Sequence, residues 1–550
     1  MKTIYKSIFG LCLCSMSVLV TGCIDETQPT DEATETQIST SSSATKALLM
    51  AMPAYLNAID QDLIDNSNWH AAFGYGAIMH IRDLQTGDMA MGTKYGGHFY
   101  RYYYDQYMGK DYMYNQYIWN YYYHFVMTTN NLISAVDTTK ATNDQLGYYG
   151  AGCAYRAMLY LDLARMYEYL PTDGTKAVNS DGNNVTNYTV PIVKEGMSQT
   201  AARNNPRAKR SDMAAFILSD LDKAEKYISD LSLANKTLPH LDAVYGLKAR
   251  LYMWIEDYAN AQKYARLAIN TTSTSVMTKD QCLNTTTGFN DIGLWMWGSQ
   301  MTSEDDAVQT GIVNWISWMS NETSFGYAGA GPYVMIDAKT YGKIDDSDFR
   351  KLLWKAPSGA ALDGQTPYID NTVGASLPTY ASVKFRPNKG NMDDYAVGAA
   401  VAFPLMRVEE MYFIEAEAAA HLDATGNAGK TLLEAFMKTY RDQTYSCSAT
   451  TQAGIIDEIV LQKRIEFWGE GLSFFDYKRL NMSVTRGYTG TNHPASARLN
   501  SNGRPAWMNV VIVKTEENNN SALKGWDNPD PSGVYTPWVS SASAKSNLLY

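Results

Sequence analysis

Three regions of the chain place apolar residues at intervals of three and four, the period of one face of a helix. They run from 119 to 167, from 211 to 269 and from 408 to 480. Between the last two, from 271 to 402, Gly, Ser, Thr, Asn and aromatic residues follow one another without a sustained helical period. The pattern predicts an all-α scaffold, mainly 119–270 and 404–480, interrupted by a loop-rich insertion at 271–403, with 60–115 contributing to the same loop-rich half.

The spacing of alanines indicates how the helices pair. A tetratricopeptide repeat needs small residues where its two antiparallel helices touch, about 12 and then about 7 positions apart. Two sets have this spacing, each with a turn residue after its first member: Ala249, Ala261 and Ala268 with Asp257, and Ala416, Ala428 and Ala435 with Gly426. We therefore expect tetratricopeptide-like helix pairs; an irregular helical bundle is the alternative.

Composition and charge exclude two classes of protein. Of 550 residues, 45% are hydrophobic and 19% are charged, which is enough to bury a large core and excludes wholesale disorder. The net charge is -11 and no dense run of Lys and Arg is present, whereas nucleic-acid binding needs clustered cations to neutralise phosphates. We expect no nucleic-acid partner and a neutral ligand.

The N-terminal region predicts export and attachment to a membrane. Residues 1–22 have two lysines before an apolar stretch, as in a signal peptide, and that stretch is too short to span a bilayer. The residues before Cys23 match a bacterial lipobox, so we expect lipidation of Cys23; an ordinary signal peptide with a chance cysteine is the alternative. Residues 23–44, rich in Thr, Ser, Asp, Glu and Gln, predict a flexible tether, and 45–550 a single body.

Signatures of catalysis and of metal binding are missing from the sequence. No HExxH, GxSxG or strand-borne GxGxxG motif occurs, and Cys153, Cys282 and Cys447 of the exported form give neither a disulfide framework nor a zinc site. We expect no cofactor and no metal. Glu466 and Glu470 lie one helical turn apart, which keeps open a glycosidase that uses paired carboxylates.

Aromatic clusters are the most distinctive candidate site. Sugar rings present flat C–H faces that stack on aromatic rings and hydroxyls that need polar partners. The aromatic candidates lie in the loop-rich half and are Trp69, Tyr95, Trp297, Trp315, Trp318 and Tyr327, with Arg82 and Asp83 as polar partners. The competing interpretation is that most of these rings belong to the core, and we expect two or three of them to contact ligand.

Several motifs spread along the chain form a distinctive set. Besides the lipobox, they are the helical segments 119–132 ending in Asn130-Asn131, 155–167, 247–252 and 406–417. A further motif is Lys384-Phe385, and the segment 459–480 carries, in this order, Arg464, Glu466, Glu470-Gly471, Phe475-Asp476 and Arg479. Together these motifs resemble the SusD/RagB family of surface glycan-binding lipoproteins of Bacteroidetes. The C-terminal pattern departs, because Val513-Lys514 stands where the family usually has Ile-Pro.

The resemblance implies a fold and a role. The implied fold is all-α, with about four tetratricopeptide helix pairs supporting an irregular ligand-binding half. The implied role is non-catalytic capture of oligosaccharides at the cell surface, on the outer membrane, for import by a SusC-like TonB-dependent transporter. Binding residues cannot be carried over by motif, because the family's binding aromatics lie in its most variable loops. Capture of peptides, in which Arg82 would matter more than stacking, and a pure scaffold for the transporter are further alternatives.

Overall fold

The computed structural model describes residues 41–60, 69–94, 98–103 and 105–540. The predicted signal peptide, Cys23 and the tether up to residue 40 lie outside the described residues, as does Tyr95. The body begins earlier than predicted, because helix α2 (Ser42–Tyr55) starts at Ser42 with Ser41 as its N-cap. The hydroxyl of Ser41 accepts a hydrogen bond from the Ala44 amide and so satisfies one of the free donors of the first turn.

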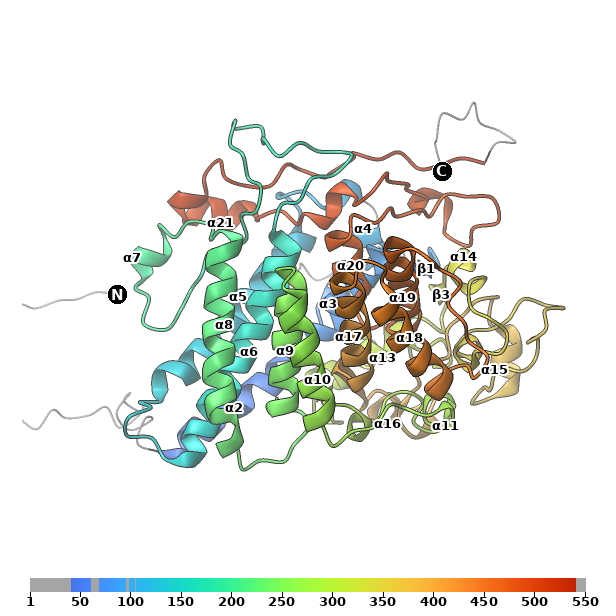
Figure 1. Ribbon diagram of the computed structural model, residues 1–550, viewed down its shortest axis with the longest axis horizontal. Coiled ribbons are helices and arrows are strands. Elements are labelled where there is room, and N and C mark those ends of the chain that lie inside the picture. The colour runs from blue at the N-terminus through green and yellow to red at the C-terminus, as the bar shows by residue number, and fades with distance from the viewer. Residues whose placement is uncertain (1–40, 61–68, 95–97, 104, 541–550) are drawn as a thin grey trace, which may run out of the picture.

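The scaffold is a series of long helices that pack on their neighbours in sequence (Figure 1). Helices α5 and α6 are joined by a short loop, and a capping box at Thr142 and Gln145 starts α6. The remaining scaffold helices follow in order on both sides of the insertion, so the prediction of an all-α scaffold is confirmed. Their bounds are α5 Met113–Ala135, α6 Asn143–Tyr167, α8 Arg210–Tyr227, α9 Leu241–Trp254, α10 Tyr258–Thr271, α17 Val408–Leu422, α18 Asn427–Tyr440, α19 Gln452–Glu466 and α20 Ser473–Arg479.

The first predicted helix pair has the expected contacts. Asp257 caps α10, and Ala249, Ala261 and Ala268 are fully buried between α9 and α10. Two small side chains facing each other let the helix backbones approach closely, which is why alanine occupies these positions.

The second helix pair forms, but its predicted contact residues are wrong by one position. Ala428 and Ala435 are exposed, and Gly429 instead faces α17. A Cβ on Gly429 would lie 2.4 Å from the Ala416 carbonyl oxygen, so the two backbones approach too closely for alanine. Alanine spacing identified the pair but not the residue at the point of closest approach.

The loop-rich half consists of short helices and two small antiparallel sheets. Much of its insertion is drawn in yellow at the right of Figure 1, whereas α3 and α4 are blue and lie nearer the centre and the top. Strand β1 (Met89–Met91) pairs with β3 (Val334–Ile336), and β2 (Trp297–Gln300) pairs with β4 (Ala402–Met406). The short helices of this half are η1 Trp69–Ala71, α3 Tyr75–Leu84, α4 Tyr100–Tyr103, η2 Asp105–Tyr107, α11 Lys279–Leu283, η4 Ile292–Leu294, α12 Asp306–Gln309, α13 Trp315–Met319, α14 Ala338–Tyr341, η5 Phe349–Leu353, α15 Asn371–Ser376, η6 Asn388–Gly390 and α16 Tyr395–Gly398.

The C-terminal segment runs back over the scaffold, in red along the top of Figure 1. The Asn528 amide donates to the carbonyl of Tyr167 at the end of α6, and Asn509 exchanges hydrogen bonds with Leu170. The remaining short elements are α7 Gln199–Ala202 and η3 Ile228–Asp230 in the scaffold half, and η7 Ala495–Ala497, η8 Ala506–Met508, α21 Lys514–Asn519 and η9 Ser521–Leu523 in this segment.

One main hydrophobic core extends from Leu49 to Leu523 and connects the scaffold with the loop-rich half. Cys153, Cys282 and Cys447 are buried free thiols within the described chain. No helix among the described residues combines the length and apolar character needed to cross a bilayer.

A buried carboxylate fixes α3 against the scaffold. Asp162 on α6 accepts hydrogen bonds from Tyr75 Oη (2.6 Å) and Arg82 Nη1 (2.9 Å) on α3 and from Tyr122 Oη (3.0 Å) on α5. Burial alone would raise the pKa of Asp162, but Arg82, Arg165 and the Tyr75 hydroxyl outweigh it and lower this pKa to about 2. Arg82 is therefore a structural residue.

Replacing this carboxylate should destabilise the protein in a pH-dependent way. A group whose pKa is lower in the folded state stabilises above its unfolded pKa, near 4, and loses that contribution as pH falls toward its folded value near 2. We expect Asp162→Asn to lower the free energy of unfolding by about 3 kcal/mol at pH 7, with the difference from wild type shrinking below pH 4. Urea unfolding at pH 7, 5 and 3.5 measures both effects.

The matched control is Asp346→Asn, which removes a carboxylate that is 56% exposed and paired with Lys351. An exposed pair contributes less than about 1 kcal/mol, so this variant should unfold almost as wild type does. A loss for Asp162→Asn that stays constant from pH 7 to 3.5 would contradict the ion-pair account.

Candidate functional site

A tight loop follows α13 in the loop-rich half. The Ser317 hydroxyl accepts a hydrogen bond from the Tyr327 amide (3.0 Å), and the Ser317 carbonyl accepts one from Ala328 (2.8 Å). Both bonds fold the loop back onto the helix. A Cβ on Gly326 would lie 2.3 Å from Thr323 Oγ1, and one on Gly329 would lie 2.1 Å from the Thr323 carbonyl oxygen. Only glycine permits this close return, which presents Tyr327 over α13.

Tyr327 belongs to a cluster of four rings, which we call the aromatic–histidine cluster: His70, His98, Trp318 and Tyr327. Tyr327 stacks on Trp318 with ring centroids 4.3 Å apart and planes inclined by 16°. His70 lies 4.5 Å from His98, and His98 lies 5.4 Å from Tyr327, both measured between ring centroids. Trp318 is 1% exposed, whereas the other three rings are half-buried. The cluster therefore consists of rings with accessible surface on a buried indole.

Hydrogen bonds fix the cluster to the 69–71 turn. Trp318 Nε1 donates to the His70 carbonyl oxygen (3.2 Å), and Tyr327 Oη lies 2.9 Å from His70 Nδ1. Burial lowers the pKa of His70, and burial together with the neighbouring His70 lowers the pKa of His98 to about 4. Both imidazoles are therefore neutral at pH 7, so the cluster offers uncharged rings to a ligand.

A second aromatic edge lies on the same loop. Phe325 packs beside Gly398, where a Cβ would lie 2.9 Å from the phenyl ring, and Tyr395 on α16 is 39% exposed. The Ser324 hydroxyl donates to Asp393 Oδ1 (2.8 Å) and links this loop to the α16 segment. Exposed Asp393 and Asp394 adjoin Tyr395 in sequence. An aromatic face beside exposed carboxylates is the combination that holds a polyhydroxylated ring.

Five of the predicted site residues are buried away from any ligand. Trp297 and Trp315 are 0% exposed: Trp297 packs edge-on against Tyr155 of α6, and Trp315 packs against Phe385. Trp318 is covered by Tyr327, Arg82 bonds Asp162, and Asp83 accepts from the Gly471 amide (2.9 Å). A side chain without accessible surface cannot stack on a sugar, so for these residues the competing interpretation, that they belong to the core, holds.

Of the other predicted residues, Tyr327 has accessible surface. Trp69 lies in η1, but its side chain falls outside the described part of the chain, as does all of Tyr95. The sequence interpretation missed His98 and Tyr395. Their residue types gave little signal, since one histidine or one tyrosine in a Tyr-rich chain is ordinary, and only the loop geometry brings His98 to Tyr327.

The paired carboxylates considered for hydrolysis are structural. Glu466 accepts hydrogen bonds from Arg350, Arg407 and Arg441, and Glu470 accepts from Lys384 and Arg407. Burial would raise the pKa of Glu466, but Arg441, Arg407 and Arg350 hold it well below its usual range. Such a carboxylate cannot serve as a general acid at neutral pH. In the described chain, no group of three or more His, Cys, Asp or Glu side chains is placed to hold a metal ion.

Two family models match separate parts of the chain. The model described as "SusD family" matches residues 357–549, and the model described as "Starch-binding associating with outer membrane" matches residues 54–253. Neither description is that of an enzyme. No curated protein matches the chain in sequence.

Solved structures share the fold over most of the chain. A SusD-like carbohydrate binding protein from Bacteroides vulgatus has a TM-score of 0.69 at 22% identity, covering 89% of this chain and 98% of its own. A SusD superfamily protein from Bacteroides thetaiotaomicron has a TM-score of 0.64 at 17% identity, covering 89% and 100%. Surface glycan-binding protein A from the same organism, in complex with laminarihexaose, has a TM-score of 0.60 at 14% identity, covering 88% and 99%.

The two models together match residues 54–253 and 357–549, and the fold is shared with a solved structure over 89% of the chain. The chain belongs to the SusD/RagB family.

Proposed function

We propose that the protein binds oligosaccharides at the outer-membrane surface without cleaving them and delivers them to a SusC-like TonB-dependent transporter. The observation that carries the proposal is the aromatic–histidine cluster, in which half-buried neutral rings lie over a buried indole. The family matches, one of them named for starch binding and outer-membrane association, and the glycan complex of a protein with this fold support the same ligand class.

The chemistry of the cluster suits a neutral sugar. A pyranose offers a C–H face to a ring such as Tyr327 and hydroxyls to polar neighbours such as Asp393. Because His70 and His98 are neutral at pH 7, the rings of the cluster themselves carry no charge that would repel or select an ionic ligand. Peptide capture through Arg82 receives no support, since that guanidinium is buried against Asp162.

Non-catalytic binding is supported by the state of the candidate acids. Glu466 is held ionised by three arginines and is 6% exposed. The proposed cluster itself contains rings and no carboxylate. A glycosidase needs a protonatable acid and a second carboxylate facing each other across the scissile bond, whereas Glu466 and Glu470 are buried and both accept hydrogen bonds from Arg407.

Lipidation of Cys23 would attach the body to the membrane through a short linker. Residues 24–41 separate the predicted lipid from α2, and a fully extended chain of this length reaches roughly 60 Å. That reach would let the body contact a partner in the same membrane while remaining attached.

Tyr327→Ala should weaken oligosaccharide binding. The substitution removes the ring that covers Trp318, so we expect the affinity for the best ligand of a panel of neutral plant, microbial and mucin oligosaccharides to fall about tenfold, equivalent to about 1.4 kcal/mol. Tyr327→Phe keeps the stacking face and loses only the hydroxyl that reaches His70, so it should retain most of the affinity. Isothermal titration calorimetry measures both.

Tyr440→Ala is the matched control, because Tyr440 is a 36% exposed tyrosine on scaffold helix α18. It should bind as wild type does. An equal loss for Tyr440→Ala and Tyr327→Ala would sink the assignment of the site, and wild-type protein that gives no heat with any member of the panel would count against glycan binding. New reducing ends during incubation would instead support a glycosidase.

Cys23→Ser should release the protein from membranes. The substitution removes the thiol that carries the acyl chains, so the protein should move from the membrane pellet to the soluble fraction and incorporate no labelled palmitate when expressed in a bacterium with the lipoprotein pathway. Cys14→Ser, within the predicted signal peptide, is the control and should stay membrane-bound. Unchanged labelling of Cys23→Ser would disprove the anchor.

A further inference from the structure

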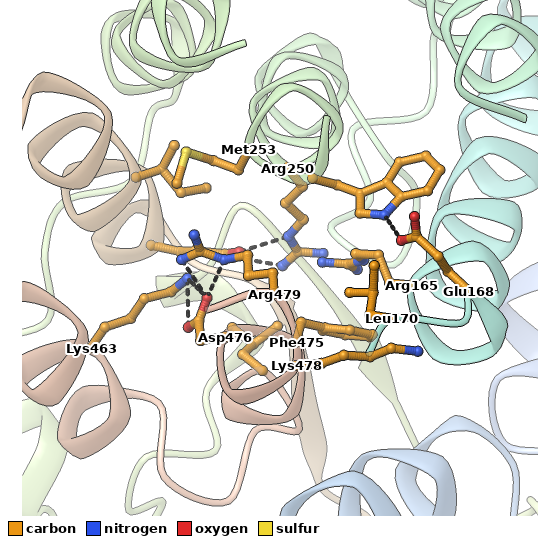
Figure 2. Close-up of a pocket in the computed structure, with 14 residues that line it drawn as sticks. Arg165, Glu168, Leu170, Arg250, Met253, Lys463, Phe475, Asp476, Lys478 and Arg479 are labelled. Atoms are coloured by element: carbon orange, nitrogen blue, oxygen red, sulfur yellow. Dashed lines mark hydrogen bonds and ion pairs between the residues drawn. The ribbon is translucent and has the colours of Figure 1, made fainter. Parts of the chain in front are cut away.

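A pocket lies within the scaffold, among α6, α9, α17, α19 and α20 (Figure 2). Its cavity has a volume of about 40 Å³. A buried water needs roughly 10–15 Å³ measured in this way, so the cavity has room for about three waters or one small polyatomic group, and not for a sugar ring. Most lining side chains are buried, and those with remaining exposure, which form the mouth, are Arg165, Leu170, Leu472 and Arg479.

The lining carries an excess of positive charge. Its basic side chains are Arg165, Arg250, Lys463, Lys478 and Arg479, and its carboxylates are Glu168, Glu410 and Asp476. Burial holds the pKa of Lys478 well below its usual range, and the four other cations alone still outnumber the three carboxylates. Extending the set to the ion-pair partners behind the wall adds Asp162, Glu417, Arg82 and Arg210, two of each sign, so the excess remains. Burying unbalanced charge is costly because water no longer solvates it, and a bound anion would offset that cost.

The three lining carboxylates are already engaged. Glu410 accepts from Nε (2.7 Å) and Nη2 (2.5 Å) of Arg250, and Asp476 lies between Lys463 and Arg479. Glu168 accepts from Trp254 Nε1 at 2.8 Å. The carboxylates of the pocket therefore accept hydrogen bonds from only some of the N–H groups of the lining cations.

Three guanidinium groups keep an open donor. Figure 2 shows the side chains of Arg165, Arg250 and Arg479 gathered in the middle of the pocket. Arg165 donates from Nη2 to Asp162 and from Nε to the Leu161 carbonyl. Arg250 and Arg479 also donate their hydrogen bonds only from Nε and Nη2. Within the described chain, Nη1 of these three arginines donates no hydrogen bond to a protein acceptor. None of the three Nη1 atoms is among the fully buried polar atoms that lack a partner, so each retains accessible surface.

Apolar side chains complete the wall. Phe475 lies under the Arg165 guanidinium at 3.6 Å from the ring centroid, and Met253, Ile414, Leu170 and Leu472 line the rest. Burial lowers the pKa of Arg165, and Arg250 and Arg82 lower it further, although Asp162 opposes them. A dry wall around open guanidinium donors strengthens their interaction with an anion, as the local dielectric is low.

We propose that this pocket binds one small oxyanion, a carboxylate or phosphate group, through the Nη1 donors of Arg165, Arg250 and Arg479. Guanidinium groups match the geometry of such anions and bind them in forked pairs. The site is separate from the aromatic–histidine cluster and does not depend on the proposed glycan binding. The anion arrives either as a free ion or as the acidic group of a larger molecule whose remainder stays at the mouth beside Leu170 and Leu472.

Thermal melting with added anions tests the site. Sodium acetate, sodium phosphate and sodium glucuronate are titrated in a zwitterionic buffer against wild type, Arg165→Met and the surface control Arg266→Met. Specific binding raises the melting temperature along a saturating curve, whereas salts excluded from the surface raise it without saturation. We expect saturation for acetate or phosphate with wild type and Arg266→Met, and a half-saturating concentration about tenfold higher or more for Arg165→Met.

Comparison of the three salts identifies the source of the anion. Saturation by glucuronate at concentrations similar to acetate would assign the group to an acidic sugar, and saturation by acetate or phosphate alone would assign a free ion. Unsaturated, equal shifts in all three proteins would overturn the proposal. Should Arg165→Met not fold, Arg165→Lys keeps the positive charge but loses the forked pair of donors, and it should bind the anion more weakly than wild type.

Wild-type crystals soaked in sodium bromide provide an independent test: anomalous density in the cavity supports the site, and its absence overturns it.

Discussion

The fold depends on a buried network of arginines and glutamates that joins the scaffold to the loop-rich half. Glu466 ends α19 and is shared by Arg407 before α17, Arg441 after α18 and Arg350 in η5. Lys384 of the insertion donates to Glu470 and to the carbonyls of Glu466 and Trp468. Each charge is expensive to bury alone and is tolerated only when its partners are in place. The irregular half therefore has one position relative to the helices.

That network also determines where the candidate site lies. The turn after α19 has Gly469 and Gly471 at positive φ, and the Gly471 amide donates to Asp83 on α3. Trp468 Nε1 donates to the Asp88 carbonyl just after α3, and Asp162 binds the same helix from the other side. Helix α3 follows η1 directly, so the position of His70, and through it that of Tyr327, rests on charges in the scaffold. A loop-rich surface is thus held by a rigid frame, the arrangement that lets loops carry binding residues.

Much of the frame could be predicted from the sequence, because a helix records its buried face in a local period. The predicted helical regions 211–269 and 408–480 hold the scaffold helices α8 to α10 and α17 to α20, and the helix pair α9 and α10 was predicted with its alanine contacts. The pair α17 and α18 was predicted with the wrong contact residue. The alanine spacing indicated Ala428, whereas the next residue, Gly429, packs against α17. The site was harder, since its rings come from segments more than two hundred residues apart, and no local pattern records which of them meet.

The misassigned tryptophans have a physical reason that also limits how this half can bind ligand. Short helices and two-stranded sheets bring few aliphatic side chains together, so large rings must fill the interior. Trp295, Trp297, Trp315, Trp318 and Trp354 are all at most 1% exposed, and Trp354 packs edge-on against Trp468 of the scaffold. An indole buries more apolar surface than any other side chain and so replaces several aliphatic ones. Rings that carry a polar atom, such as Tyr327, His98 and Tyr395, instead occupy positions that are partly exposed to solvent. The accessible Tyr327 ring is thus positioned by an indole, Trp318, that has almost no accessible surface of its own.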